Sequence, residues 1–298
     1  MSALVLLMIL ALAAFAGCGG GGGDVNANDL AVPWVNPEGH TPYIGSLSVN
    51  PADSSLFMGT NTGLWRIEEG ASRPQKVTGR LSTPDGSGRV SEALVAQFTG
   101  PDTLIGSGHP SSGQELPPVL GLIRSEDAGR TWESVSELGA ADFHALELST
   151  GRIVGALFGQ ADVLISSDDG RTWDTQTAPM PLVDLAVDPT NPERWFGTTE
   201  QGLFESGDGG QSWRQQEPIP NIRLAWQPGG DLYRVDPGGP VKVSADGGRS
   251  WQERGSTGGE PHAMTVAQDG TIYVALLDGT LKVSDDGGET FSEQVRGG

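Results

Sequence analysis

The sequence has few cysteines that could cross-link a fold and few long apolar runs that could span a membrane. Its 298 residues include one cysteine, which excludes an internal disulfide framework. The longest uncharged apolar run, Ala3 to Ala16, has 14 residues, whereas a membrane-spanning helix needs about 20. Basic residues are also scarce, since Lys+Arg total 18 against 38 for Asp+Glu, and the formal net charge is −20. Such a surface repels phosphate backbones, so we expect no nucleic-acid partner.

The apolar run is of the length expected for the core of a signal peptide. It ends in Phe15-Ala16-Gly17-Cys18, followed by five glycines, and small residues before a cysteine resemble the bacterial lipobox. That resemblance implies lipidation of Cys18. We therefore expect a signal peptide over residues 1–17, a flexible glycine-rich tether over 18–41, and an exported lipoprotein held at the cell envelope membrane. Plain secretion and a short membrane anchor are the alternatives.

What the chain has instead is a repeat. A box of the form Ser-x-Asp-x-Gly-x-(Thr/Ser)-(Trp/Phe) occurs five times, starting at Ser125, Ser166, Ser206, Ser244 and Ser284. The aromatic residues that end the boxes lie 41, 40, 38 and 40 residues apart. A sustained period with turn signals is typical of a repeat architecture.

Each repeat reads as four short strands joined by turns. Asp-Gly and Gly-Gly pairs separate runs rich in β-branched and aromatic residues, which is a hairpin signal. Aligning the first strands on their last apolar residue gives six units, at Val49, Phe98, Leu148, Val187, Trp226 and Val266. The first two spacings, 49 and 50, exceed the others and indicate insertions in two units. Four strands in each of six units predict an all-β, six-bladed β-propeller of antiparallel blades over residues 42–298, and we expect a monomer.

The boxes fall between the third and fourth strands of their units. There glycine permits a positive φ, and the aspartate can accept hydrogen bonds from the turn. A catalytic group would not be repeated in five equivalent turns around a ring, so we assign a structural role to Asp127, Asp168, Asp208, Asp246 and Asp286. Calcium binding is excluded because the boxes lack the alternating acidic ligands and the distal Glu of an EF-hand loop.

The repeated box resembles the BNR, or Asp-box, repeat of the sialidase superfamily. The stretch GSGHP, Gly106 to Pro110, followed by LPPVLGLIRSEDAGRTW and ADFHALEL, also looks like bacterial exported propellers described as glycosyl hydrolases or sialidase-like. The resemblance implies a propeller that serves either as a recognition and assembly module or as a glycoside hydrolase.

One face of such a propeller is the candidate binding face. The loops that enter each first strand, and those that join the second and third strands, open on the face opposite the boxes. Four residues before the alignment points the first strands carry His144 and His262, and His109 and Glu115 lie on an enlarged loop. Imidazole is both a switchable acid or base and a common metal ligand. We therefore expect ligand binding at His109, His144, His262, Asp142 and Glu115.

Three functions remain open at this face. The first, which we favour, is binding of a small-molecule, glycan or protein ligand without catalysis and without a cofactor. The second is sialidase-like glycoside hydrolysis, for which the family chemistry implies arginines, a tyrosine and an acid; the candidates are Tyr43, Asp142, Glu260 and Arg223. The third is a divalent metal site formed by His109, His144 and His262.

Overall fold

The computed structural model describes residues 41–84, 86–111 and 113–297, which fold into strands and turns. The predicted signal peptide, Cys18, the tether up to residue 40 and His40 lie outside these residues. Within the described part, no helix has the length and hydropathy needed to span a bilayer.

Five sheets contain four antiparallel strands each, hydrogen-bonded in chain order. Their innermost strands are β1 (Ile44–Val49), β10 (Phe143–Ser149), β14 (Asp184–Val187), β18 (Arg223–Trp226) and β22 (Pro261–Val266). The second strands are β2 (Leu56–Thr60), β11 (Arg152–Leu157), β15 (Trp195–Thr199), β19 (Leu232–Val235) and β23 (Ile272–Leu276). The third strands are β3 (Gly63–Ile67), β12 (Asp162–Ser166), β16 (Gly202–Ser206), β20 (Pro240–Ser244) and β24 (Leu281–Ser284). The outermost strands are β4 (Gln75–Val77), β13 (Asp174–Thr177), β17 (Arg214–Glu217), β21 (Gln252–Ser256) and β25 (Ser292–Val295).

The second unit departs from the four-stranded plan. It has five strands, β5 (Gly79–Thr83), β6 (Gly86–Gly100), β7 (Thr103–Pro110), β8 (Leu122–Ser125) and β9 (Thr131–Ser136). The inserted hairpin β5–β6 pairs antiparallel within itself, and β5 also pairs parallel with β9, so this sheet closes on itself as a barrel. The prediction of six four-stranded blades is therefore wrong for this unit, and five such blades are present. The reason is the first insertion, which lengthens the inner strand enough to recruit an extra partner.

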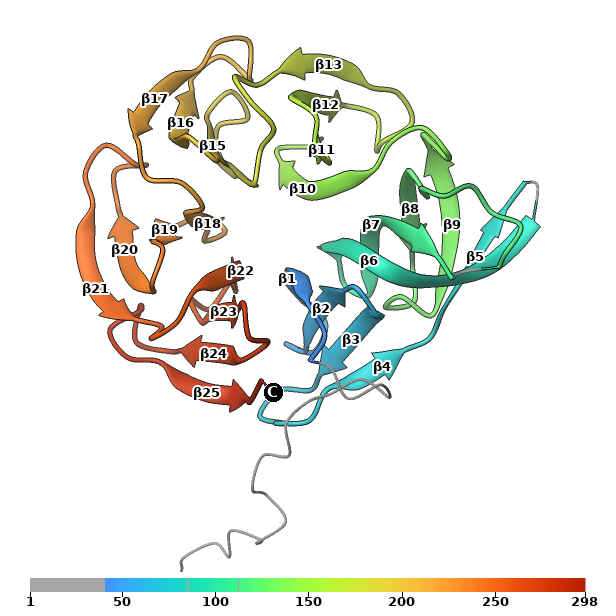
Figure 1. Ribbon diagram of the computed structural model, residues 1–298, viewed down its shortest axis with the longest axis horizontal. Coiled ribbons are helices and arrows are strands. Elements are labelled where there is room, and N and C mark those ends of the chain that lie inside the picture. Colours follow the sequence, from blue (N-terminus) through green and yellow to red (C-terminus); the bar gives the residue numbers. More distant parts are fainter. Residues whose placement is uncertain (1–40, 85, 112, 298) are drawn as a thin grey trace, which may run out of the picture. The chain divides into compact units, whose positions relative to one another are not determined.

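The sheets follow one another in a ring (Figure 1). Each innermost strand contacts the next, and β22 contacts β1, which closes the circle. The Gln294 side chain also donates a hydrogen bond to the carbonyl oxygen of Ala71 at 3.0 Å, joining the last sheet to the first. Because the first and last sheets meet through packing and this bond, the ring of described strands leaves no exposed inner edge.

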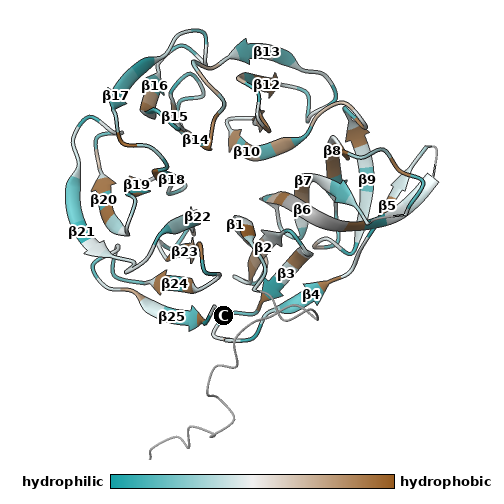
Figure 2. Ribbon diagram, viewed as in Figure 1, coloured by the Kyte–Doolittle hydropathy of each residue, from teal (hydrophilic) through white to brown (hydrophobic). Residues whose placement is uncertain are grey.

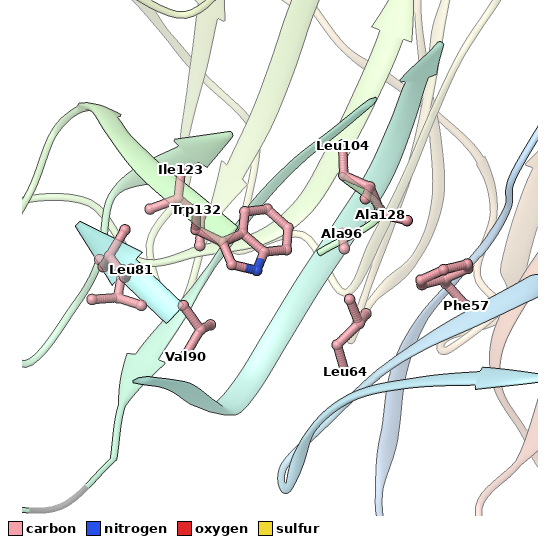
Figure 3. Packing of buried hydrophobic residues seen from close by; sticks show 10 residues of the cluster. Phe57, Leu64, Leu81, Val90, Ala96, Leu104, Ile123, Ala128 and Trp132 are labelled. Carbon is pink, nitrogen blue, oxygen red and sulfur yellow. The ribbon is translucent and has the colours of Figure 1, made fainter. Parts of the chain in front are cut away.

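Burial falls from the inner strands to the outer ones. All five residues of β2 and of β15 are buried, whereas β13 and β21 are mostly exposed. Figure 2 shows the same trend as hydrophilic colour on β17, β21 and β25 along the rim. The apolar residues form clusters between neighbouring sheets; one of them joins Phe57 and Leu64 to Trp132 (Figure 3). Packing between sheets, rather than a single central core, therefore holds the ring together.

The five boxes form equivalent turns. In the second box, the backbone amide of Gly170 donates to the Ser166 hydroxyl at 2.8 Å, and that hydroxyl donates to Asp168 Oδ1 at 2.8 Å. The amide of Thr172 donates to the same Asp168 Oδ1 at 2.9 Å, and its hydroxyl donates to Oδ2 at 2.7 Å. The same set of bonds recurs at the aspartates of the other four boxes, Asp127, Asp208, Asp246 and Asp286. These carboxylates bind their own turns.

The glycine of each box also serves the packing of the ring. Gly170 has a φ of +83°, and a Cβ built there would lie 2.0 Å from Leu122 of the preceding sheet. Only glycine meets both constraints, which explains why this position of the box does not vary among the five copies.

Candidate functional site

A pocket of about 590 Å³ opens at the centre of the face opposite the boxes. The loops that line it enter first strands or join second to third strands, as the sequence predicted for the binding face. Four candidates lie in its wall: Tyr43, His144, Arg223 and His262. A narrow cavity of about 60 Å³ continues from it between the innermost strands, because both are lined by Gly45, His144, Arg223 and His262.

Two exposed aromatic rings stand in this pocket. Tyr43 is 50% exposed and Phe158 is 61% exposed, which is unusual in a chain whose other large apolar side chains are mostly covered. The Tyr43 ring packs edge-on against His262 with centroids 4.0 Å apart. The Phe158 ring stacks on His144 with centroids 4.2 Å apart and planes inclined by 27°. Each imidazole therefore supports an aromatic ring that faces solvent.

Backbone hydrogen bonds fix both aromatic residues. The Tyr43 amide donates to Asn61 Oδ1 at 2.9 Å, and the Asn61 amide donates to the Tyr43 carbonyl at 3.1 Å. The Phe158 amide donates to the Asp142 carbonyl at 2.9 Å. Since each ring sits on a loop tied to a neighbouring strand end, the two rings are held in place before any ligand arrives.

Arg223 supplies the positive charge of the pocket. Its Nη1 donates to the Val183 carbonyl at 3.0 Å, while its buried Nε has no acceptor among the described residues. Glu200, which is exposed, lines the same pocket and is the single carboxylate in its wall among the described residues.

Burial sets the protonation of the two histidines. Burial, reinforced by the nearby charge of Arg223, lowers the pKa of His262 to about 4. Burial also lowers the pKa of His144, an effect that Asp142 opposes and His109 reinforces. At neutral pH His262 is therefore uncharged and carries one ring donor and one ring acceptor.

Asp142 joins two of the predicted histidines. Its Oδ2 lies 3.5 Å from His109 Nε2 and 3.8 Å from His144 Nε2. Its Oδ1 is buried and has no hydrogen-bond partner among the described residues. The fold thus brings His109, Asp142 and His144 together. His144 lines the pocket, whereas His109 and Asp142 do not.

The three-histidine metal site is not assembled. His109 and His144 share Asp142, but His262 packs on Tyr43 instead. In the described ranges, no group of three or more His, Cys, Asp or Glu side chains is arranged to hold a metal ion. The prediction failed because alignment of two histidines on equivalent strands places them in the same pocket without making their ring nitrogens converge.

Two predicted acids lie away from the pocket. Glu260 accepts a hydrogen bond from the Gly238 amide at 2.8 Å, in the sheet of β18 to β21, and Glu115 is exposed on the enlarged loop. Neither lines the pocket. The sialidase interpretation also requires an activated tyrosine, yet burial raises the pKa of Tyr43, with Arg223 only partly opposing it. A raised pKa makes this hydroxyl a poorer nucleophile.

Sequence reasoning missed Phe158, Asn61 and Glu200. All three lie in turns between the second and third strands of their sheets, which open on the face predicted for binding. Phe158 carried a usable signal, because an aromatic residue in a short turn between two strands has no core to enter.

Two acids lie in the narrow cavity below the pocket. Burial raises the pKa of Glu147 well above its ordinary value, and the nearby Asp184 raises it further. Burial also raises the pKa of Asp184, while Arg223 and the amides of Leu224 and Leu185 lower it. Arg223 thus balances part of the acidic charge of the narrow cavity.

Comparison with known proteins supports the fold and part of the functional prediction. No family model matches the chain. The oligoxyloglucan-reducing end-specific xyloglucanase of Emericella nidulans is 28% identical over 203 residues, which cover 54% of this chain and 25% of that protein. A probable enzyme of the same name from Neosartorya fischeri is 24% identical over 204 residues, with the same coverage. The chain thus spans about a quarter of the length of these curated relatives.

Among solved structures, an ancestral GH74 enzyme superposes with a TM-score of 0.53 at 14% identity, covering 89% of this chain and 40% of the other. A likeness at this identity shows the β-propeller fold alone. The curated relatives named here are xyloglucanases, so they give no support to the sialidase type.

Proposed function

We propose that the pocket between Tyr43 and Phe158 binds a neutral oligosaccharide. The observation that carries this proposal is the pair of exposed aromatic rings, each backed by an imidazole, in the wall of one pocket. A sugar ring presents an apolar face of C–H groups and an edge of hydroxyls. An aromatic ring suits the first, and a few convergent polar groups suit the second.

The polar groups of the pocket match the edge of a sugar. The guanidinium group of Arg223 offers donors, and Glu200 and the ring of His262 offer acceptors. The Arg223 and Glu200 charges oppose one another, and His262 is neutral because its pKa is about 4. A ligand without net charge therefore fits better than the carboxylate sugar of a sialidase, for which a cluster of arginines would be expected.

The class of sugar comes from the relatives. Their names describe enzymes that act on xyloglucan oligosaccharides, which are neutral β-linked glucans with side chains. We assign this chain a ligand of the same class, since a glucan backbone offers flat faces to Tyr43 and Phe158.

Binding is favoured over hydrolysis. A glycoside hydrolase of the usual kind places two carboxyl groups about 5 to 10 Å apart on either side of the bond that breaks. The described wall of this pocket contains Glu200 as its single carboxylate, while Asp142 lies behind His144. Hydrolysis is the second candidate function because of the relatives' names, and it needs a second acid to enter the pocket on binding.

Calorimetric titration of the full chain with a xyloglucan heptasaccharide tests the proposal. We expect saturable binding, weakened about tenfold, or about 1.4 kcal/mol, in Tyr43→Ala and in Phe158→Ala. The matched control is Leu277→Ala, which removes the other large exposed apolar side chain, 59% exposed and outside the pocket. Absence of binding at millimolar sugar, or an equal loss in Leu277→Ala, would contradict the proposal.

A turnover assay separates the two candidates. Incubating the chain with xyloglucan oligosaccharides and analysing the products is expected to return intact sugar. Release of shorter products that Glu200→Gln abolishes would establish hydrolysis and overturn the assignment of a binding-only role.

Export and lipid anchoring are part of the same proposal. Cys18 and the apolar run before it resemble a lipobox, and a surface-held propeller would meet polysaccharides outside the cell. Metabolic labelling with a tritiated fatty acid is expected to label the chain, and Cys18→Ser is expected to abolish the label. Equal labelling of both proteins would contradict the anchor.

A further inference from the structure

A second pocket lies on the inserted hairpin, away from the site described above. It has a volume of about 400 Å³ and is lined by Thr78, Gly79, Arg80, Gly88, Arg89 and Gln114. It shares no residue with the pocket of Tyr43 and Phe158. Its wall contains two arginines and no acidic or apolar side chain beyond its glycines, which sets it apart from the rest of an acidic protein.

The two arginines are placed side by side. Arg80 of β5 and Arg89 of β6 are direct cross-strand partners, and both side chains are exposed. Like charges directly opposite one another on neighbouring strands destabilise a sheet. A chain with a net charge of −20 has ample acidic residues to neutralise them.

Several arginines elsewhere in the fold have acidic partners. Arg66 pairs with Asp53 at 2.7 Å, Arg152 with Glu193 at 2.7 Å, and Arg234 with Glu217 at 2.8 Å. No such carboxylate accompanies Arg80 or Arg89 among the described residues. The pair thus retains two guanidinium groups for an acceptor that is not part of the described fold.

The strands that carry the pair are anchored to the sheet. Leu81 and Val90, next to the two arginines in sequence, point to the opposite face and pack in the cluster around Trp132 (Figure 3). Leu81 is fully buried, and β5 is fastened on its other side by parallel pairing with β9. Alternation along the strands therefore fixes the two arginines outward on an anchored support.

Gln114 supports the backbone of the strand that carries Arg89. Its Oε1 accepts a hydrogen bond from the Arg89 amide at 2.5 Å, which leaves the NH₂ group of this amide as a further donor. Gly88 makes this contact feasible, because a Cβ there would lie 1.9 Å from Gln114 Oε1. The outward face of the hairpin thus presents two guanidinium groups and the exposed Thr78 hydroxyl, while Gln114 lies on the Leu81 face, next to Gly88.

We propose that Arg80 and Arg89 bind the carboxylate of an acidic sugar, a uronic acid. Guanidinium groups match a planar oxyanion with paired hydrogen bonds. A partner protein would require an apolar centre to its interface, and this pocket has none. The net charge of −20 also repels a highly charged polyanion more strongly than a sugar with one carboxylate.

The test compares two disaccharides that differ in one group. Cellobiouronic acid carries a carboxylate where cellobiose carries a hydroxymethyl group, and each is titrated into the full chain at low and at physiological salt. We expect the acid to bind at least tenfold more tightly than cellobiose through this site, with an affinity that falls as salt rises. The double variant R80Q/R89Q is expected to lose at least tenfold in affinity for the acid.

Control variants keep this test independent of the proposed function. Arg249→Gln removes one exposed arginine that also lacks an acidic partner among the described residues, and it is expected to leave the affinity unchanged. Leu277→Ala, outside both pockets, is likewise expected to leave uronate binding unchanged. The thermal midpoint of R80Q/R89Q is expected to equal or exceed that of the parent, because the variant removes a repulsion.

Three results would overturn the proposal. The first is equal affinity for cellobiouronic acid and cellobiose. The second is an equal loss of affinity in Arg249→Gln and in R80Q/R89Q. The third is tighter binding of inorganic sulfate or of hexaglutamate than of the uronate, which would assign the pocket to a free inorganic anion or to an acidic peptide.

Discussion

The two faces of the ring use aspartate side chains in opposite ways. On the box face, Asp168 holds its own turn through hydrogen bonds from Ser166, Thr172 and the turn amides, and four other sheets repeat the arrangement. On the pocket face, Asp142 occurs once, stands between two imidazoles, and leaves one buried oxygen without a partner in the described fold. The repeated aspartates are hydrogen-bonded within their own turns, which indicates a structural role, whereas Asp142 is neither repeated nor fully satisfied among the described residues.

Aromatic residues divide in the same manner. Trp132, which ends the first box, is buried between two sheets and donates its indole N–H to the Gly129 carbonyl at 2.9 Å. Tyr43 and Phe158 expose half or more of their surface to solvent. The first kind of aromatic residue stabilises the fold, and the second is available to a ligand.

The largest expected effect comes from removing a buried box aromatic. Trp132→Ala is expected to lower the free energy of unfolding by about 3 to 5 kcal/mol, because it empties the centre of the cluster in Figure 3. Urea denaturation followed by circular dichroism measures the change. Tyr43→Ala is the control and is expected to cost less than about 1 kcal/mol. Similar losses of unfolding free energy in Trp132→Ala and Tyr43→Ala would contradict the difference between the two kinds of aromatic residue.

A loss of intermediate size in the free energy of unfolding is expected when the pH is lowered, because His262 lies on the pocket face with a lowered pKa. The pKa of His262 is about 4 in the fold and about 6.5 when unfolded, so the unfolded chain binds the extra proton between these values. Stability contributed by the neutral imidazole is therefore present above pH 6.5 and lost as the pH falls toward 4. We expect a loss of about 1 to 3 kcal/mol over that window, allowing for partial solvent screening.

The variant His262→Gln isolates this contribution. Its free energy of unfolding, measured by urea titration at several pH values, is expected to vary less between pH 6.5 and 4 than that of the parent. An identical slope in the two proteins would show that His262 does not titrate as described.

The smallest effect is expected from the box carboxylates. Hydrogen bonds from the Thr172 amide and hydroxyl, and from Ser166, lower the pKa of Asp168 to about 2. A lowered pKa contributes stability above about pH 4 that is lost as the pH falls toward 2. Asp168→Asn is therefore expected to show a shallower acid transition than the parent, whereas Asp169→Asn, at the exposed neighbour, is expected to match the parent. Equal acid transitions in parent and Asp168→Asn would contradict the structural role of the box.

The repeat made most of the fold predictable. Boxes and alternating strands placed the ends of four innermost strands at Val49, Val187, Trp226 and Val266, where the structure ends them. The second unit was not predictable, because the pairing of β5 with β9 is parallel and joins segments far apart in the sequence. A local pattern of turns and alternation contains no signal for such a contact.

The sequence predicted which residues lie on the pocket face, but it did not predict which of them contact one another. Counting from the boxes placed His144, His262, Tyr43 and Arg223 on one face, and all four line one pocket. Whether His144 and His262 would meet depended on how each ring packs, and the rings of Phe158 and Tyr43 decided it. Arg80 and Arg89 gave no signal because their register across the hairpin depends on the length of the inserted strand.

The central claim is that the ligand binds the pocket face while the box face only supports the ring. Hydrogen–deuterium exchange of the full chain, with and without the xyloglucan heptasaccharide, tests it most directly. We predict slower exchange on binding in the segments around Tyr43, Asn61 and Phe158, and unchanged exchange in the five box turns. Protection confined to the box turns, with no change at those three residues, would contradict the account.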